Sequence, residues 1–341
     1  MQKKRFVSDL QEGELLDELF MIKTARLGET RAGKPYLAIT FFDKSGEISG
    51  PAWEHAESLQ KFCIAGAVVR VCAQVQTYRE KLQLKVESIN PVEHADDQLE
   101  AFVPASHRQS ENMLEELAQL IGSIQNSFLK KLLRKIFNKS NSGALFQLAP
   151  AAKGIHHAYL GGLLEHSLSM AQVASRLADH YNGINRDLLV AGALLHDIGK
   201  TEELRSESGV IDYTDIGRLK GHLVIGCELI GRQAKSLKDF PDELLTHLQH
   251  LVLSHHGRHE FGSPVVPMTA EALLLSFIDD MDAKMNLVEQ LSRKLKNGPA
   301  QWSDYQRSLE RFLLLQPLVS EKEQFSEERE MESDLKQPRL F

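Results

Sequence analysis

The sequence contains little cysteine and no long apolar segment. Its three cysteines (Cys63, Cys72 and Cys227) are too few and too scattered among 341 residues for a disulfide framework or a zinc knuckle. No apolar run approaches the roughly 20 residues that a membrane-spanning helix needs, and the basic segment 1–12 lacks the apolar core of a signal peptide. These absences argue against a secreted or membrane-bound protein, so we expect a cytoplasmic protein with no membrane partner.

The overall composition is that of a soluble globular protein, with 42% hydrophobic and 26% charged residues. A chain of 341 residues is too long for one ordinary core and long enough for two domains. The net charge of −7 argues against a protein that coats nucleic acid. The net charge is still compatible with a nucleic-acid enzyme, because the charged residues are unevenly distributed along the chain. Segment 130–139 is basic, whereas segment 321–341 holds seven acidic and four basic residues.

Residues 15–93 show the alternation of apolar and polar side chains that is typical of β-strands. Five short strands with a helix between the third and the fourth match the OB-fold, a small barrel, although the pattern fits other small β-barrels equally well. Pro51 would interrupt a ladder unless it lies at a strand edge. The strands are expected over 19–26, 36–43, 47–53, 67–75 and 82–86, and the helix over 54–62.

Beyond residue 95 the apolar side chains recur every three or four positions, which indicates helices. We expect a helical linker over 96–150, an all-helical domain over 151–318 and a charged, disordered tail over 319–341. The fold class is therefore multidomain α+β, with a five-stranded OB-fold barrel over 1–95 followed by an all-α helical core. The predicted helices of that core cover 154–181, 187–196, 221–235, 243–254, 270–295 and 303–315.

Histidines and aspartates interrupt the apolar helices of this domain. His196 and Asp197 end a helix that is apolar on nearly every side and should be buried. A buried His-Asp pair is costly unless it is paired or binds a metal. Asp279 follows another apolar run, so its burial would carry the same cost. His166 also lies among leucines. A single metal site would offset the burial costs of all these side chains. Its ligands can also include His222, His255 and His256.

The ligand types restrict the metal. Mixed imidazole and carboxylate ligands suit Mn, Fe, Co, Ni or Zn, whereas an all-oxygen shell would suit Mg or Ca. One ion would take His166, His196, Asp197 and Asp279, and the second oxygen of Asp197 would bridge to another ion held by His222 and by His255 or His256. Two ions about 3.5–4 Å apart can activate a water and neutralise the attacking and leaving oxygens of a phosphodiester.

Lys200 follows Asp197 by three positions and is a candidate for the same site. Its ammonium group would contact a substrate phosphate or the attacking water. A surface lysine after a helix end explains the residue equally well.

The sequence resembles a known family. The order His166, His196-Asp197 and Asp279 is similar to that of the HD-domain phosphohydrolase superfamily. Gly-Leu-Leu-Glu-His at 162–166, His-Asp-Ile-Gly-Lys at 196–200 and Ser-His-His-Gly at 254–257 narrow the resemblance to the YhaM-type 3′→5′ exoribonucleases. That family joins an N-terminal OB-fold to an HD domain, and segments 33–37 and 43–48 also resemble its barrel. The resemblance covers residues 15–315.

The resemblance implies a metal-dependent hydrolase that removes nucleotides processively from the 3′ end of single-stranded RNA, usually with Mn. Nucleoside 5′-monophosphates would be the products, and single-stranded DNA is a further expected substrate. Asp197 and Lys200 are the expected catalytic residues. Family members often assemble, so a homo-oligomer is expected by analogy. The implied metal ligands are His166, His196, Asp197 and Asp279, with His222, His255 and His256 at a second position.

An OB-fold binds single strands with aromatic side chains that stack on bases and basic side chains that contact phosphates. Phe41 and Phe42 are adjacent in a strand and point to opposite faces, so we expect at most one of them in the core. Stacking contributes about 1–3 kcal/mol per base without sequence preference. The candidates are Tyr36, Phe41, Trp53 and Tyr78 for bases, and Lys34, Arg79 and Lys81 for phosphates.

Two other functions fit the same residues. The first is another HD-domain activity, as a nucleotide phosphohydrolase or a cyclic-nucleotide phosphodiesterase. The second is a non-catalytic protein that binds single strands, which the complete ligand set disfavours because a degenerate HD domain is expected to lose ligands.

Overall fold

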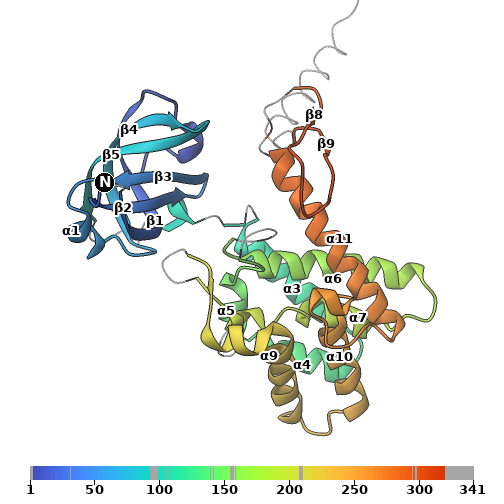
Figure 1. Ribbon diagram of the computed structural model, residues 1–341. Coiled ribbons are helices and arrows are strands. Elements are labelled where there is room, and N and C mark those ends of the chain that lie inside the picture. The colour runs from blue at the N-terminus through green and yellow to red at the C-terminus, as the bar shows by residue number, and fades with distance from the viewer. Residues whose placement is uncertain are drawn as a thin grey trace, which may run out of the picture. The chain divides into compact units, whose positions relative to one another are not determined.

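The computed structural model describes residues 3–30, 32–92, 99–103, 105–106, 108–138, 140, 142–153, 157, 159–206, 210–293, 295 and 298–318. The predicted tail, 319–341, lies outside these residues. The chain divides into two compact units, Met1–Asp279 and Asp280–Phe341. The first unit contains an N-terminal barrel and a set of helices (Figure 1). Among the described residues no helix is long and apolar enough to cross a membrane.

Five strands form a closed barrel in the order β1-β2-β3-β5-β4. β1 is long enough to pair with β4 along its first half and with β2 along its second half. The barrel closes through a parallel pairing of β3 with β5 at Ser49 and Gln83. This topology confirms the predicted OB-like fold. The elements are β1 (Leu15–Glu29), β2 (Pro35–Asp43), β3 (Gly46–Ala52), α1 (Ala56–Gln60), β4 (Val68–Tyr78) and β5 (Lys81–Pro91).

Phe41 and Phe42 are both buried, on opposite sides of β2. Phe41 lies in the barrel core at 0% exposure, where its ring fills the space that Gly50 leaves: a β-carbon there would lie 2.8 Å from the ring. Phe42 packs outside the barrel with Phe102 of α2 (Leu99–Phe102). The expectation that at most one of them is in a core was wrong, because a helix after the barrel covers its outer face.

Pro51 lies opposite Ala38 in the ladder between β2 and β3. It comes after the Ser49–Gln83 pairing that joins β3 to β5, near the end of β3. A proline here interrupts no pairing on the β5 side, so the barrel tolerates it.

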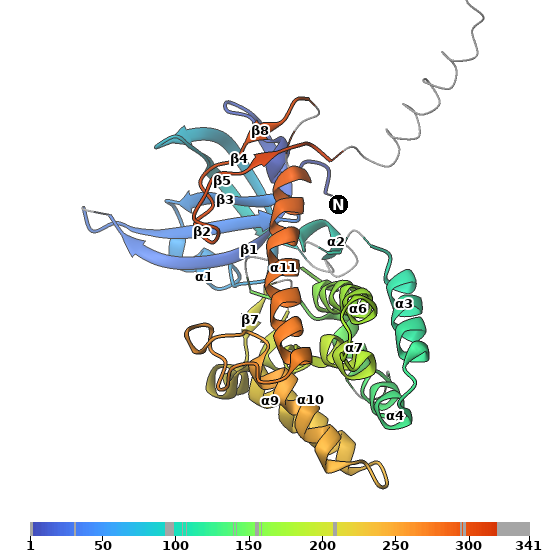
Figure 2. The same cartoon turned by 90° about the vertical axis from the view of Figure 1, so that its right-hand side faces the viewer.

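Most of the helices that follow the barrel, α3 to α7, α9, α10 and the first part of α11, contribute to one apolar core. α3, α4 and α5 contribute Met113, Leu132 and Phe146 to the same cluster as Leu163 of α6. α6 and α7 lie side by side (Figure 2). The helices are α3 (Ser110–Ser123), α4 (Ser127–Ile136), α5 (Gly143–Leu148), α6 (Gly162–His180), α7 (Arg186–Leu195), α8 (Lys200–Glu203), α9 (Asp215–Lys235), α10 (Asp242–Ser254) and α11 (Ala270–Arg293). Short hairpin strands β6 (Leu204–Arg205) and β7 (Asp212–Tyr213) lie between α8 and α9.

The predicted helix over 303–315 was wrong. Most of this segment of the second unit lies between two short paired strands, β8 (Gln301–Trp302) and β9 (Leu314–Leu315). The rings of Tyr305 and Phe312 meet edge to face across the turn, with centroids 5.2 Å apart. Aromatic residues spaced for a helix face can also pair across a hairpin, and here the cross-strand contact prevails.

Candidate metal centre

Five elements bring the predicted ligands together. His166 lies one turn into α6, and His196 and Asp197 directly follow α7. His222 lies in α9 just after a kink at Gly221, where the backbone has a φ of 72°. His255 and His256 follow α10, and Asp279 lies on α11. Except for His222, His256 and Asp279, these residues are buried.

His166, His196, Asp197 and Asp279 form the first group. The Nε2 atoms of His166 and His196 are 3.2 Å apart. His166 Nε2 lies 3.3 Å from Asp279 Oδ1, and His196 Nε2 lies 3.3 Å from Asp197 Oδ2. Each of the two imidazole nitrogens therefore lies 3.3 Å from a carboxylate oxygen, and the structure brings these four predicted residues together.

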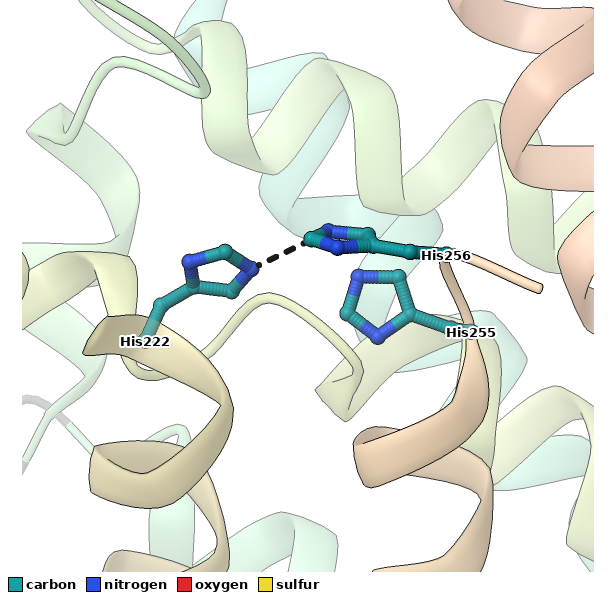
Figure 3. Close-up of side chains that lie close together, drawn as sticks. All are labelled: His222, His255 and His256. Atoms are coloured by element: carbon teal, nitrogen blue, oxygen red, sulfur yellow. Dashed lines mark hydrogen bonds between the residues drawn. The ribbon is translucent and has the colours of Figure 1, made fainter. Parts of the chain in front are cut away.

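His222, His255 and His256 form the second group (Figure 3). The Nε2 atoms of His222 and His256 are 3.3 Å apart. Asp197 Oδ1 lies 3.4 Å from His222 Nε2 and 3.6 Å from His255 Nε2. The two oxygens of Asp197 thus face different groups of imidazoles.

Most of these rings are held through Nδ1. His196, His255 and His256 donate Nδ1–H to the main-chain oxygens of Ala193, Val252 and Phe261, over 2.9, 2.8 and 2.9 Å. A carbonyl oxygen can only accept, so each ring carries its proton on Nδ1 when neutral. Its Nε2 lone pair then points into the site, which is the form that a metal ion binds.

The chemistry of the donor atoms fits a cation. Asp197 Oδ1 is buried and accepts no hydrogen bond from any described residue. It faces imidazole nitrogens that carry lone pairs, so electron-rich atoms meet one another without a proton between them. A divalent ion satisfies both the carboxylate and the rings, and the mixture of nitrogen and oxygen donors suits a first-row transition metal.

Lys200 is part of the site and not a surface lysine. Its Nζ lies 2.5 Å from Asp197 Oδ2, and its side chain is 12% exposed. Burial lowers the pKa of Lys200, but the Asp197 carboxylate outweighs burial and raises it above the ordinary value. Burial likewise raises the pKa of Asp197, yet Lys200 and His196 outweigh it and hold that pKa well below the ordinary range. Both groups are therefore charged at neutral pH.

Two residues near the site were missed as functional candidates. Glu203 accepts a hydrogen bond from His222 Nδ1 over 3.1 Å. Burial raises the pKa of Glu203, but this contact outweighs burial and keeps it below the ordinary value. The buried His157 lies with its ring 5.2 Å from that of His166, and its Nδ1 contacts Tyr159 Oη over 2.8 Å. Nothing in the spacing of either residue distinguishes it from a helix-end glutamate or a loop histidine.

The candidate nucleic-acid residues of the barrel fall into two places. Tyr36 and Trp53 stack on each other with ring centroids 4.9 Å apart and an angle of 30°, and Trp53 is 57% exposed. Lys34 is exposed just before β2. At the turn between β4 and β5, Tyr78 is 56% exposed and Arg79 Cζ lies 5.3 Å from its ring centroid, while Lys81 begins β5.

Phe41 does not belong to this surface. Its ring is fully buried in the barrel core, so it has no face on which a base can stack. Sequence alternation alone could not show this, because either side of a barrel strand can be covered.

Comparison with known proteins gives two family-model matches and a similar solved structure. Residues 163–284 match the family model of the HD domain, and every candidate ligand lies within that match. Residues 100–184 match a second model, described as "Putative helicase". The solution NMR structure of the second OB-fold domain of replication protein A from Methanococcus maripaludis is similar over 27% of this chain and 96% of that chain, with 18% sequence identity and a TM-score of 0.22. The helical region therefore carries the HD domain over residues 163–284.

Proposed function

We propose that this protein is a metal-dependent 3′→5′ exoribonuclease that hydrolyses single-stranded RNA to nucleoside 5′-monophosphates. The observation that carries the proposal is the position of Asp197, whose two oxygens face two separate groups of imidazoles. A bridging carboxylate of this kind supports a two-ion site, the arrangement that clamps both the attacking and the leaving oxygen of a phosphodiester. Asp197 and Lys200 are the proposed catalytic residues.

The ligands divide between two ions. His166, His196, Asp197 and Asp279 would hold the first, and Asp197 with His222, His255 and His256 would hold the second. Mn is the proposed ion because nitrogen and oxygen donors are mixed here, a set that also accommodates Co, Fe, Ni or Zn. Bound divalent ions would supply a Lewis acid and lower the pKa of a water to near neutrality.

The side chains of the chain have their own parts in this reaction. Asp197, charged at neutral pH, places its two oxygens between the ligand groups. Lys200 keeps its proton because the adjacent carboxylate stabilises the ammonium form. It therefore cannot act as the base at neutral pH. Its positive charge, 2.5 Å from Asp197 Oδ2, is available to stabilise the negative charge that develops on the phosphate.

The barrel carries aromatic and basic side chains that suit a single-stranded polymer as the substrate. The stacked pair of Tyr36 and Trp53 offers an exposed indole to a base, and Lys34 carries positive charge close to it in sequence. Tyr78, Arg79 and Lys81 offer a second aromatic and basic group. Stacking tolerates any base, which suits an enzyme that degrades RNA of any sequence. Single-stranded DNA is a further proposed substrate, and a homo-oligomer and a cytoplasmic location remain predictions.

The test uses full-length protein loaded with Mn and a 5′-labelled single-stranded RNA. A ladder that shortens from the 3′ end supports the proposal, and blocking the 3′ hydroxyl should stop it. Asp279→Ala should abolish the ladder. Asp280→Ala is the matched control, because the neighbouring carboxylate is exposed and pairs with Lys284.

Parallel reactions with free nucleotides and cyclic nucleotides separate the alternatives. Cleavage of these small substrates without cleavage of RNA would overturn the exoribonuclease in favour of a nucleotide phosphohydrolase or a cyclic-nucleotide phosphodiesterase. Binding of RNA without any cleavage would favour the non-catalytic single-strand-binding protein.

A further inference from the structure

Glu203 has a buried carboxylate directed at one of the candidate ligands. Its side chain is 9% exposed and ends α8, outside both ligand groups. Its Oε1 accepts a hydrogen bond from the main-chain nitrogen of His222 over 3.0 Å and another from Nδ1 of the same residue over 3.1 Å. A single oxygen therefore fixes both the backbone and the ring of His222.

The kink in α9 explains why the main-chain contact exists. Gly221 has φ 72° and ψ 156°, so the helix is interrupted there and restarts at His222. The first main-chain N–H groups of a helix have no partner one turn back. Glu203 supplies that partner from another element, in the way that a capping side chain does.

Close packing holds Glu203 in this position. A β-carbon on Gly217, in the first part of α9, would lie 2.3 Å from the main-chain oxygen of Glu203. Thr214 Oγ1 also donates to the main-chain oxygen of Glu202 over 2.7 Å. The backbone of α8 thus rests directly on α9, which leaves the carboxylate little freedom to move away from His222.

The Nδ1 partner of His222 differs in charge from those of its neighbours. His196, His255 and His256 donate to neutral main-chain oxygens, whereas His222 donates to a carboxylate. A carboxylate on Nδ1 fixes the tautomer and increases the electron density on Nε2, so the ring becomes a stronger ligand. His222 Nε2 points toward Asp197 Oδ1, 3.4 Å away.

We propose that Glu203 is a positioning residue for the second ion: it orients His222 and strengthens it as a ligand. This inference rests on the proposed two-ion centre. Glu203 touches neither substrate nor ion in this role, and it acts only through the His222 ring. Losing such a partner typically weakens metal binding about 10–100-fold.

The experiment measures metal binding and not activity. The Mn content of full-length protein is determined by mass spectrometry after loading and desalting, and the electron paramagnetic resonance spectrum reports whether two ions lie close enough to couple. Glu203→Gln is the main variant, because its amide oxygen still accepts both hydrogen bonds while the charge is lost. Glu202→Gln is the control, since Glu202 faces Arg232 on the surface at 3.8 Å.

Wild-type protein and Glu202→Gln should hold two ions with a coupled spectrum. Glu203→Gln should hold the first ion, lose coupling, and regain it at about 10–100-fold higher Mn. Thermal unfolding in EDTA checks that the variant folds. If it does not, Glu203→Asp, which keeps the charge but withdraws it from the ring, should show the same selective loss.

Two results would overturn the inference, and they are distinguishable. Two tightly bound, coupled ions in Glu203→Gln would make Glu203 a helix cap only, with the two-ion centre intact. The second result is a wild-type protein that holds only one ion, with an occupancy that His222→Ala does not change. This result would exclude a second ion, and it would therefore also exclude the proposed role of Glu203. RNA cleavage by such a protein would still leave the hydrolase proposal standing.

Discussion

Gly199 and His222 touch so closely that no side chain fits between them: a β-carbon on Gly199 would lie 2.0 Å from the carbonyl oxygen of His222. Gly199 has an ordinary helical conformation, with φ −63°, so the need for glycine is one of space and not of backbone angle. The contact ties the segment after Asp197 to the start of the second part of α9. The distance between the two ligand groups therefore depends on this glycine.

Gly199→Ala should separate these segments and weaken the second ion more than the first. We expect a loss of about 1–3 kcal/mol in the free energy of unfolding, as for other overpacked sites. Thermal unfolding and bound Mn per chain measure the two effects. Gly122→Ala in α3 is the control, because no atom lies within 4 Å of its added carbon, and it should stabilise the helix by about 0.5–1 kcal/mol. Full occupancy of both ions in Gly199→Ala would contradict the prediction.

Metal binding should stabilise the folded protein, because the unfolded chain has no assembled site. At an Mn concentration 100 times the Kd, the gain is about 2.7 kcal/mol for one ion, and EDTA should reverse it. Asp197→Asn should abolish nearly all of the rise in melting temperature, since its carboxylate faces both ligand groups. Asp279→Asn should remove only the part due to the first ion. Equal melting curves with Mn and with EDTA in the wild-type protein would count against the centre.

The sequence was sufficient to predict the barrel, and it also singled out polar residues that the structure brings close together. Alternation of period two marked all five strands, and five strands with a helix after the third matched the OB-fold. His196 and Asp197 were recognisable because charged and polar groups at the end of an apolar helix carry a burial cost that a metal removes. The same cost identified Asp279, which the structure places 3.3 Å from His166.

The residues that sequence could not predict depend on contacts between distant segments. Glu203 is a buried carboxylate only because α8 rests on a glycine of α9. Phe42 is buried only because Phe102 covers the outside of the barrel. The hairpin that contains Tyr305 and Phe312 replaces a predicted helix for the same reason, since a cross-strand ring contact is invisible to a local pattern.

RNA binding by the barrel should depend on Gly28, through its contact with the ring of Tyr36. A β-carbon on Gly28 would lie 2.8 Å from the ring of Tyr36, which stacks on Trp53. Gly28→Ala should therefore tilt the Tyr36 ring and weaken binding of single-stranded RNA, as Trp53→Ala should by about 1–3 kcal/mol. Fluorescence anisotropy with labelled RNA measures both. Trp302→Ala is the matched control, because that residue is also exposed, at 69%. Equal losses from Trp53→Ala and Trp302→Ala would exclude a specific platform.

The barrel should depend on a buried ion pair near the N-terminus. Lys3 Nζ lies 3.0 Å from Asp43 Oδ2, and both side chains are fully buried. Asp43 also accepts from the main-chain nitrogens of Val7 and Ser45, each over 2.9 Å. Asp43→Ala should cost about 3–5 kcal/mol, because it removes the ion-pair partner of a buried ammonium group. The exposed pair of Lys23 and Glu47 is the control, and Glu47→Ala should cost about 0–1 kcal/mol.

Urea unfolding followed by Trp53 fluorescence measures this stability, in a Trp302→Phe background that isolates the barrel signal. The pH dependence has a definite sign. Burial lowers the pKa of Lys3 in the folded chain, despite the opposing effect of Asp43. At pH values just below 10.5, Lys3 therefore binds more protons in the unfolded chain than in the folded chain. A rise in pH through this range consequently increases the contribution of Lys3 to the free energy of unfolding. A loss similar to that of Glu47→Ala would show that the pair contributes little.

The three cysteines should differ in reactivity toward a thiol reagent at pH 8. Burial raises the pKa of Cys63 to about 11 and that of Cys227 to about 12. Because the thiolate is the reacting form, only about one molecule in a thousand of Cys63, and fewer of Cys227, is reactive at that pH. Cys72 is less buried than Cys63, so the native protein should release about one equivalent of chromophore and the denatured protein about three. Raising the pH toward 11 should speed the slow phase, and rapid labelling of Cys72→Ser at pH 8 would show that the other two thiols are not protected.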